Sequence, residues 1–303
     1  MIKCGFPFDA PGRSNNHIDT NYNNNYNVFV NLILFVSFFT FLIHLTESLA
    51  YSIRFAGLRT RQIAIAMSFV TSTLLVSRLS NMFQAPLLGN MVDTAIKQSN
   101  SMSIDKLQMN FRIIIFAAAL GTFVGILLTP TFINIFNIAI KKFLIIGSLP
   151  KMAIMALKPR NIVTIVKCIR MPYIPSFKNL RLGHVSKTFL FMNLFVTSIY
   201  TIGVLCALYA GAKLPHLRAT AVQLSGIVNG IATILLTLVV DPEGARVTDQ
   251  AVHEQRPPED VKTVVISLLF TKFIGTLVVA QLFFIPASFY IIKVTEIIEK
   301  YFS

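Results

Sequence analysis

Tryptophan is absent from this sequence, and acidic residues are scarce: 13 Asp and Glu stand against 27 Lys and Arg in 303 residues. Only 13% of the residues are charged, whereas a soluble domain usually has about a quarter. This scarcity excludes an ordinary soluble enzyme, and the 54% share of hydrophobic residues excludes disorder over most of the chain. The net charge of +14 alone would allow nucleic-acid binding, but the apolar bulk indicates a membrane protein with a basic inner face and no nucleic-acid partner.

Cysteine and enzyme motifs are also nearly missing. The three cysteines, Cys4, Cys168 and Cys206, are too far apart for a disulfide framework or a metal site. The sequence contains no P-loop, no G-x-S-x-G, no H-E-x-x-H and no G-x-G-x-x-G motif. His44 and Glu47 lie three residues apart, but this pair alone is not a metal motif. We therefore predict no catalytic residue, no cofactor and no metal.

Long apolar runs dominate the rest of the chain. A membrane-spanning helix needs about 20 apolar residues. Six stretches meet this length, so we predict an all-α, polytopic integral membrane protein built as a bundle of about six transmembrane helices with a basic amphipathic cytoplasmic loop. The six runs lie at roughly 28–53, 62–88, 111–140, 188–212, 219–240 and 262–294. Residues 28–303 then form a single transmembrane domain, and residues 1–27 form an Asn-rich tail that we predict to be disordered.

Small residues four positions apart recur inside these runs. Two examples are the pairs Gly121 with Gly125 and Gly226 with Gly230. Such spacing lets helix backbones approach closely, so we expect both pairs at helix contacts in the bundle.

Positive charge concentrates in the third loop, residues 141–187, which has ten Lys and Arg and no acid. Because cytoplasmic loops are rich in these residues, the odd-numbered loops are predicted to face the cytoplasm and both termini to lie outside. Within this loop, 143–157 and 160–171 are predicted to be short amphipathic helices in the inner interface. Their cations would attract anionic lipid or simply anchor the loop. The candidates are Lys141, Lys142, Arg160, Lys167 and Arg170.

The first run carries a polar stripe at helical spacing, made of Thr40, His44, Glu47, Tyr51 and Arg54. A polar face inside an apolar helix is not expected to face lipid. Ionisable groups at this depth are costly, so the stripe predicts a substrate cavity. A hydrogen-bonded cluster that fixes the position of the helix is the alternative.

Further polar candidates lie in the second and last runs. Arg78, Asn81 and Gln84 precede Pro86, which favours a lined cavity over an arginine that reaches to the outer interface. Lys272 is near the middle of the last run, and Glu47 is the only acid at similar depth in any run. We predict that these two form an ion pair, or that Lys272 binds a ligand phosphate.

The run from His44 to Thr60 (HLTESLAYSIRFAGLRT), followed by Ser77–Asn81 (SRLSN) and Gln84–Pro86 (QAP), resembles the Amj family of bacterial lipid II flippases, the alternate to MurJ. The resemblance implies a multi-pass protein of the bacterial cytoplasmic membrane. It would move undecaprenyl-pyrophosphate-linked peptidoglycan precursors from the inner to the outer leaflet, and so serve cell wall biogenesis and cell shape. Its partners would be lipid II and the bilayer, and its oligomeric state is left open. Two alternatives stay open: a transporter of another polyprenyl-linked or anionic lipid, and a membrane enzyme or assembly factor acting on such lipids.

Overall fold

The computed structural model describes residues 15–98, 101–170 and 185–302, with side chains from Val30 onward. In this part of the chain every regular element is a helix. The long helices are α1 (Asn15–Thr60), α2 (Ile63–Lys97), α3 (Ser101–Ile146) and α6 (Lys187–Lys213). The shorter ones are α4 (Leu149–Ala156), α5 (Pro159–Lys167), α7 (Arg218–Leu235), α8 (Asp241–Val252), α9 (Pro258–Ile274) and α10 (Ala280–Phe302).

Two π-helical turns join shorter helices into continuous spans. Leu236–Val240 connects α7 to α8, and Gly275–Val279 connects α9 to α10. With these connections, six helical segments of the described chain are long and apolar enough to cross a membrane. The predicted six-span, all-α fold is therefore confirmed.

Several boundaries differ from those predicted. α1 begins at Asn15, so the helix takes in the second part of the Asn-rich stretch, and residues 1–14 lie outside the described residues. The fifth loop, expected to run from 241 to 261, is mostly helix: α8 continues the fifth span directly, and only 253–257 connect it to α9. The low hydropathy of α8 concealed it, because this helix packs on its neighbours at the end of the bundle rather than crossing the apolar core of the membrane.

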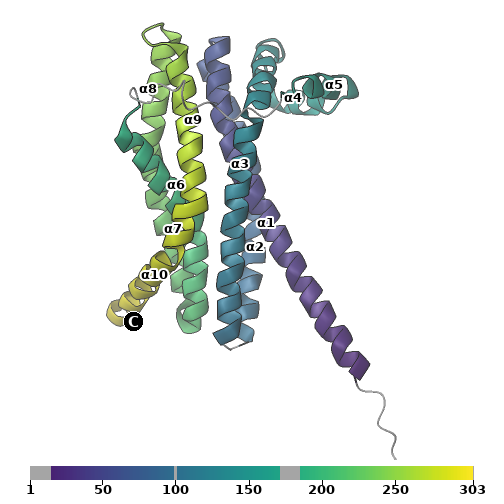
Figure 1. The fold of residues 1–303 in the computed structure, drawn as a ribbon, viewed down its shortest axis with the longest axis vertical. Coiled ribbons are helices and arrows are strands. Elements are labelled where there is room, and N and C mark those ends of the chain that lie inside the picture. The colour runs from purple at the N-terminus through teal and green to yellow at the C-terminus, as the bar shows by residue number, and fades with distance from the viewer. Residues whose placement is uncertain (1–14, 99–100, 171–184, 303) are drawn as a thin grey trace, which may run out of the picture.

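The odd-numbered connections lie together at one end of the bundle. Residues 61–62, helices α4 and α5, and residues 253–257 are at the top of Figure 1, whereas the α2–α3 and α6–α7 connections are at the bottom. We call the top the basic end. Helices α4 and α5 project sideways there, as expected for helices that lie in an interface (Figure 1).

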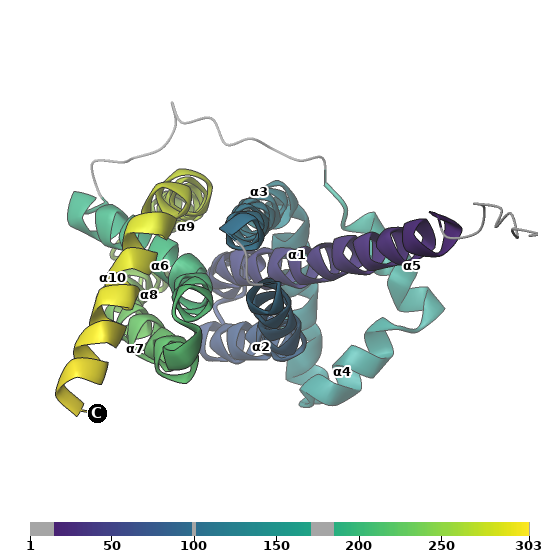
Figure 2. The same ribbon diagram turned by 90° about the horizontal axis from the view of Figure 1, so that it is seen from below.

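The bundle consists of two groups of helices, which lie side by side in Figure 2. The first contains α1, α2 and α3, and the second contains α6 to α10. At the end opposite the basic end the two groups share one apolar core, which includes Met91, Phe111, Leu205 and Phe284. At the basic end there are two clusters instead. One is centred on Phe136 and Ile53, and the other on Val247 and Leu268. The second of these clusters also contains Leu58 of α1, so the groups are joined by a large core at one end and by a smaller apolar contact at the other.

Glycines set the closest helix contact in the first group. A Cβ atom at Gly121 would meet the carbonyl oxygen of Phe41, and one at Gly125 would lie 2.6 Å from Cβ of Ser48. The α1 and α3 backbones can approach this closely only because both positions lack a side chain. The prediction is confirmed for this pair. It is wrong for Gly226 and Gly230, where a Cβ would meet no atom within 4 Å.

Candidate functional site

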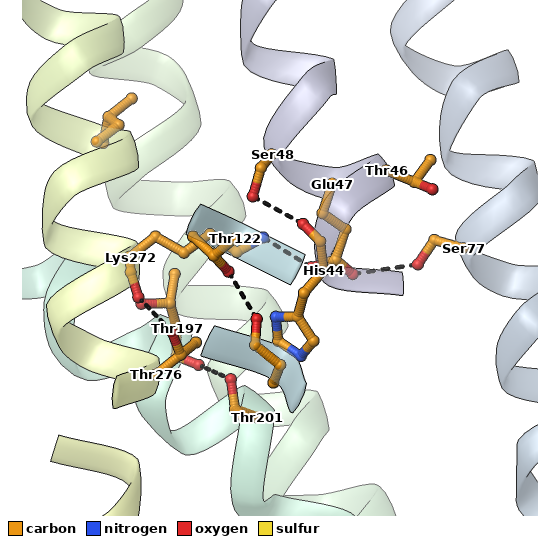
Figure 3. Close-up of polar contacts among 12 residues, drawn as sticks. His44, Thr46, Glu47, Ser48, Ser77, Thr122, Thr197, Thr201, Lys272 and Thr276 are labelled. Atoms are coloured by element: carbon orange, nitrogen blue, oxygen red, sulfur yellow. Dashed lines mark hydrogen bonds and ion pairs between the residues drawn. The ribbon is translucent and has the colours of Figure 1, made fainter. Parts of the chain in front are cut away.

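A buried ion pair connects the two groups of helices. The Lys272 Nζ atom on α9 lies 2.9 Å from the Glu47 Oε2 atom on α1, and the Ser77 hydroxyl on α2 donates a hydrogen bond to Glu47 Oε1 over 3.2 Å. Only 5% of the Lys272 side chain and 16% of the Glu47 side chain are exposed. The predicted Glu47–Lys272 pair is confirmed, and Figure 3 shows the two side chains reaching toward each other.

The helix around Lys272 is shaped locally to hold this side chain inside. The π-helical turn Gly275–Val279 starts three residues after it, and the Thr276 hydroxyl donates to the Lys272 carbonyl oxygen over 3.0 Å. A Cβ at Gly275 would lie 2.9 Å from the Leu194 carbonyl oxygen, so the glycine lets this segment press against α6. Such π-helical turns often occur at functional sites.

His44 lies one turn before Glu47 on the same face of α1. Its side chain is buried, and its Nδ1 atom has no hydrogen-bond partner among the described residues. Figure 3 places the ring beside the Glu47–Lys272 pair, and both charged groups act on it electrostatically. A buried polar atom without a partner costs stability, so packing alone does not explain why a histidine occupies this position.

The rest of the predicted stripe also faces other helices. Thr40 accepts a hydrogen bond from the Gln84 side chain of α2, and both residues are buried. At the basic end, Arg54 Nη2 lies 2.6 Å from Asp241 Oδ1, at the start of α8. Tyr51 lies between these contacts, half-buried, with the Arg54 guanidinium 5.9 Å from its ring centre. The stripe thus contacts α2, α9 and α8 in succession.

Two predicted cavity residues lie outside this cluster. Arg78 and Asn81 are exposed on α2, although Ser77 beside them is buried and bonded to Glu47. Tyr200 of α6 is within electrostatic range of both Glu47 and Arg78, so Arg78 lies on the exposed side of the same region. The structure therefore brings together His44, Glu47, Ser77 and Lys272, and leaves Arg78 and Asn81 at the periphery.

Sequence reasoning missed most of the polar contacts between the two groups. Arg112 Nη1 donates to the Gln281 carbonyl oxygen over 3.0 Å, and the Gln281 amide donates back to the Arg112 carbonyl over 2.8 Å. Arg218 of α7 pairs with Asp93 of α2. Asp241 lies in residues 241–261, which the apolar runs predict to be a loop. The sequence did contain a signal for the Arg54–Asp241 contact. Asp241 comes directly after an apolar run, and Arg54 had no predicted partner.

An apolar groove of about 460 Å³ opens between α3 and α9 at the basic end. Its lining also includes Phe55 and Arg59 of α1 and Arg170, which follows α5. The walls are almost entirely apolar, and the cations Arg59, Arg170 and Lys262 are the charged residues of the lining. Sequence reasoning did not find this groove, because it forms between segments far apart in the chain.

The basic candidates of the third loop lie around this end. Lys141, Arg160, Lys167 and Arg170 are exposed, and Lys142 Nζ donates to the Asn161 side chain over 3.2 Å. Helix α5 also exposes apolar residues, among them Val163 and Val166. This mixture is typical of a helix at a membrane surface. The described residues contain no group of three or more His, Cys, Asp or Glu that could hold a metal ion.

Comparisons with known proteins agree with the resemblance noted in the sequence. The family model described as "Amj: Alternate to MurJ" matches residues 39–295. The chain is 37% identical over 265 residues to the lipid II flippase Amj of Bacillus subtilis (strain 168); the match covers 87% of this chain and 97% of that protein. No solved structure matches.

Proposed function

This chain belongs to the Amj family, and on that premise we propose that it is a flippase that moves lipid II from the inner to the outer leaflet of the cytoplasmic membrane. Its Bacillus relative is named a lipid II flippase, which is a transporter rather than an enzyme. The observation that carries the proposal is the buried Glu47–Lys272 pair between the two groups of helices, with the unpartnered His44 beside it.

A flippase for this substrate must offer the charged headgroup a polar path while the polyprenyl chain stays in lipid. The headgroup bears a pyrophosphate, whose oxygens are suitable partners for a lysine ammonium. We propose that the pyrophosphate replaces Glu47 as the partner of Lys272. Lys272 then keeps a counter-charge throughout, which matters because an unpaired buried charge is strongly unfavourable. Glu47 keeps the hydrogen bond from the Ser77 hydroxyl but loses its counter-charge, so the exchange requires that the Glu47 carboxylate take up a proton.

The division into two groups of helices supports a rocking motion. The largest apolar core joins the groups at the end opposite the basic end, and the polar pairs Glu47–Lys272 and Arg54–Asp241 connect them toward the basic end. Ion pairs and hydrogen bonds can break and re-form in different combinations, whereas a close-packed apolar core resists sliding. We propose that the basic end, which the positive-inside rule places in the cytoplasm, opens and closes in this way.

Complementation tests the proposed function. Cells depleted of their main lipid II flippase should survive when this gene is expressed, and die when it carries Lys272→Met. The matched control is Lys97→Met, which removes an exposed lysine at the end of α2 and should still permit survival. Death of cells that express the correctly inserted wild-type protein would remove lipid II as the substrate. Transport of a different polyprenyl-linked or anionic lipid would then be the function to test.

A further inference from the structure

We propose that the groove between α3 and α9 is the site where the substrate is loaded, with one polyprenyl chain in the apolar groove and the pyrophosphate bound by Arg59, Arg170 and Lys262. The direction of transport in this proposal rests on the proposed function, but the binding site itself does not.

The walls of the groove suit a hydrocarbon chain. They come mainly from α3 and α9, and Phe123 and Phe273 of the lining contact each other with ring centres 5.6 Å apart. Phe123 and Phe270 are 40% and 41% exposed, so the apolar surface continues to the outside of the bundle. In a bilayer, this side opening lets the chain enter from the lipid without crossing water. The full apolar lining is Phe55, Phe123, Ile126, Leu127, Pro130, Ile133, Val265, Ile266, Leu269, Phe270 and Phe273.

Three cations from three separate segments form the headgroup end. Arg59 comes from the last turn of α1, Lys262 from the first turns of α9, and Arg170 from the segment after α5. No acidic residue lines the groove, and none of the three cations has a carboxylate partner in the described part of the chain. Three unneutralised cations beside an apolar groove favour a ligand that joins a multiply charged anion to a hydrocarbon chain.

Two of these cations are held in place by neighbouring groups. The Thr131 hydroxyl accepts a hydrogen bond from the Arg170 N–H over 3.0 Å and donates one to the Arg170 carbonyl oxygen over 3.2 Å. This double contact ties the segment after α5 to α3, one residue beyond Pro130. The Arg59 guanidinium lies 4.8 Å from the ring centre of Phe55, which also lines the groove. The main chain at Arg170 and the side chain of Arg59 therefore have defined contacts before any ligand binds.

The groove leads to the buried ion pair. On α1, Glu47, Tyr51, Phe55 and Arg59 follow one another at intervals of four residues, so they form a stripe that turns gradually around the helix. On α9, Lys272 continues the line of Val265 and Leu269, which form part of the wall. The 12 residues from Arg59 back to Glu47 span about 18 Å of helix. A headgroup that leaves the three cations therefore first passes Arg54, which is paired with Asp241, and then reaches Lys272.

A polyprenyl pyrophosphate fits this arrangement better than a bulk phospholipid such as phosphatidylglycerol. The three cations match the multiple charge of a pyrophosphate more closely than the single charge of a phosphodiester. The volume of about 460 Å³ lies within the range of small-ligand pockets.

Lipid binding to the full-length purified protein tests the site. Native mass spectrometry would titrate undecaprenyl pyrophosphate against the wild type and the triple variant Arg59→Gln/Arg170→Gln/Lys262→Gln. Each cation near an anionic lipid contributes on the order of a fivefold factor in affinity, so we expect the triple variant to bind about a hundredfold more weakly. The matched control, Lys151→Gln/Lys158→Gln/Lys187→Gln, removes the same charge from exposed positions outside the groove and should bind like the wild type.

A second pair of variants tests the apolar walls. Ile266→Trp fills the groove and should reduce binding of undecaprenyl pyrophosphate, whereas Leu282→Trp adds the same bulk to an exposed position on α10 and should not. Equal loss in the two triple variants would overturn the site, because binding would then depend only on total charge. Full displacement by equimolar phosphatidylglycerol would also overturn it, by showing a general anionic-lipid surface.

The binding assay and the complementation assay can fail independently. Specific binding without rescue of flippase-depleted cells would keep the groove and reject lipid II transport. Rescue by the triple variant at wild-type expression would reject the groove as the loading site and keep the transport function.

Discussion

At the scale of single residues, Glu47 and Lys272 illustrate how far sequence reasoning extends. The sequence predicts their pairing because each is an ionisable residue at similar depth in an apolar run, and the 2.9 Å contact confirms the pair. Arg54 is a contrasting case, since its partner Asp241 lay in a segment expected to be a loop. A pair is predictable from sequence when both members interrupt apolar runs, and not when one lies at an uncertain helix boundary.

The effect of breaking the Glu47–Lys272 ion pair on the free energy of unfolding can be measured directly. Lys272→Met and Glu47→Gln should each lower the free energy of unfolding by about 3 kcal/mol, because each leaves one buried charge without its counter-charge. The double variant Glu47→Gln/Lys272→Met removes both charges and should recover most of this loss. Thermal unfolding of the purified protein in detergent checks this, with Lys97→Met as the exposed control. Single variants as stable as the wild type would show that the charges are not desolvated as a pair.

At the scale of helices, the closest contact depends on glycines, which have no side chain to keep two helices apart. The apolar runs predicted where helices form, but not which glycine pairs lie at a contact. Gly121 and Gly125 face the α1 backbone, whereas Gly226 and Gly230 face open space, although the spacing is the same. Spacing describes one face of one helix. The partner that covers this face is decided by how the whole bundle packs.

Gly121→Ala should destabilise the protein by about 1–3 kcal/mol. The added Cβ would meet the Phe41 carbonyl oxygen, and a backbone atom cannot move away by a change of rotamer as a side chain can. The same change at Gly226 should be neutral or stabilise by up to ~1 kcal/mol, since glycine is a poor helix former and the site is open. The two melting temperatures in detergent provide the comparison. Equal values would mean that α1 and α3 do not pack as described.

At the scale of the whole molecule, the distribution of charge is asymmetric. The third loop carries ten of the 27 Lys and Arg, and the fold places its described helices, α4 and α5, at the same end as the other odd-numbered connections. The groove, with its three cations, opens at this same end, while the shared apolar core closes the other. This asymmetry suits a protein that accepts an anionic lipid from one leaflet and releases it to the other.

Labelling of single cysteines tests the orientation. In a variant with Cys4, Cys168 and Cys206 changed to serine, Gln98→Cys lies on the α2–α3 connection and Gln255→Cys on the α8–α9 connection, and both positions are exposed. A membrane-impermeant maleimide should label Gln98→Cys in intact cells and Gln255→Cys only after permeabilisation, because the basic end is expected in the cytoplasm. The opposite labelling pattern would mean that the basic end, and with it the groove, faces the outside of the cell.

The sequence by itself determined the environment and the class of fold. Apolar runs of membrane-spanning length leave a backbone no alternative to helices in lipid, and the excess of Lys and Arg in odd loops sets the predicted orientation. It also determined the polar stripe on α1, since helical spacing alone puts those residues on one face. Only the tertiary structure decided which helices meet that face, that Arg78 lies outside the cluster, and that a cation-rimmed groove forms between α3 and α9. The physical reason is that these features depend on side-chain packing between segments as far apart as Arg59 and Lys262, and helix periodicity contains no information about partners.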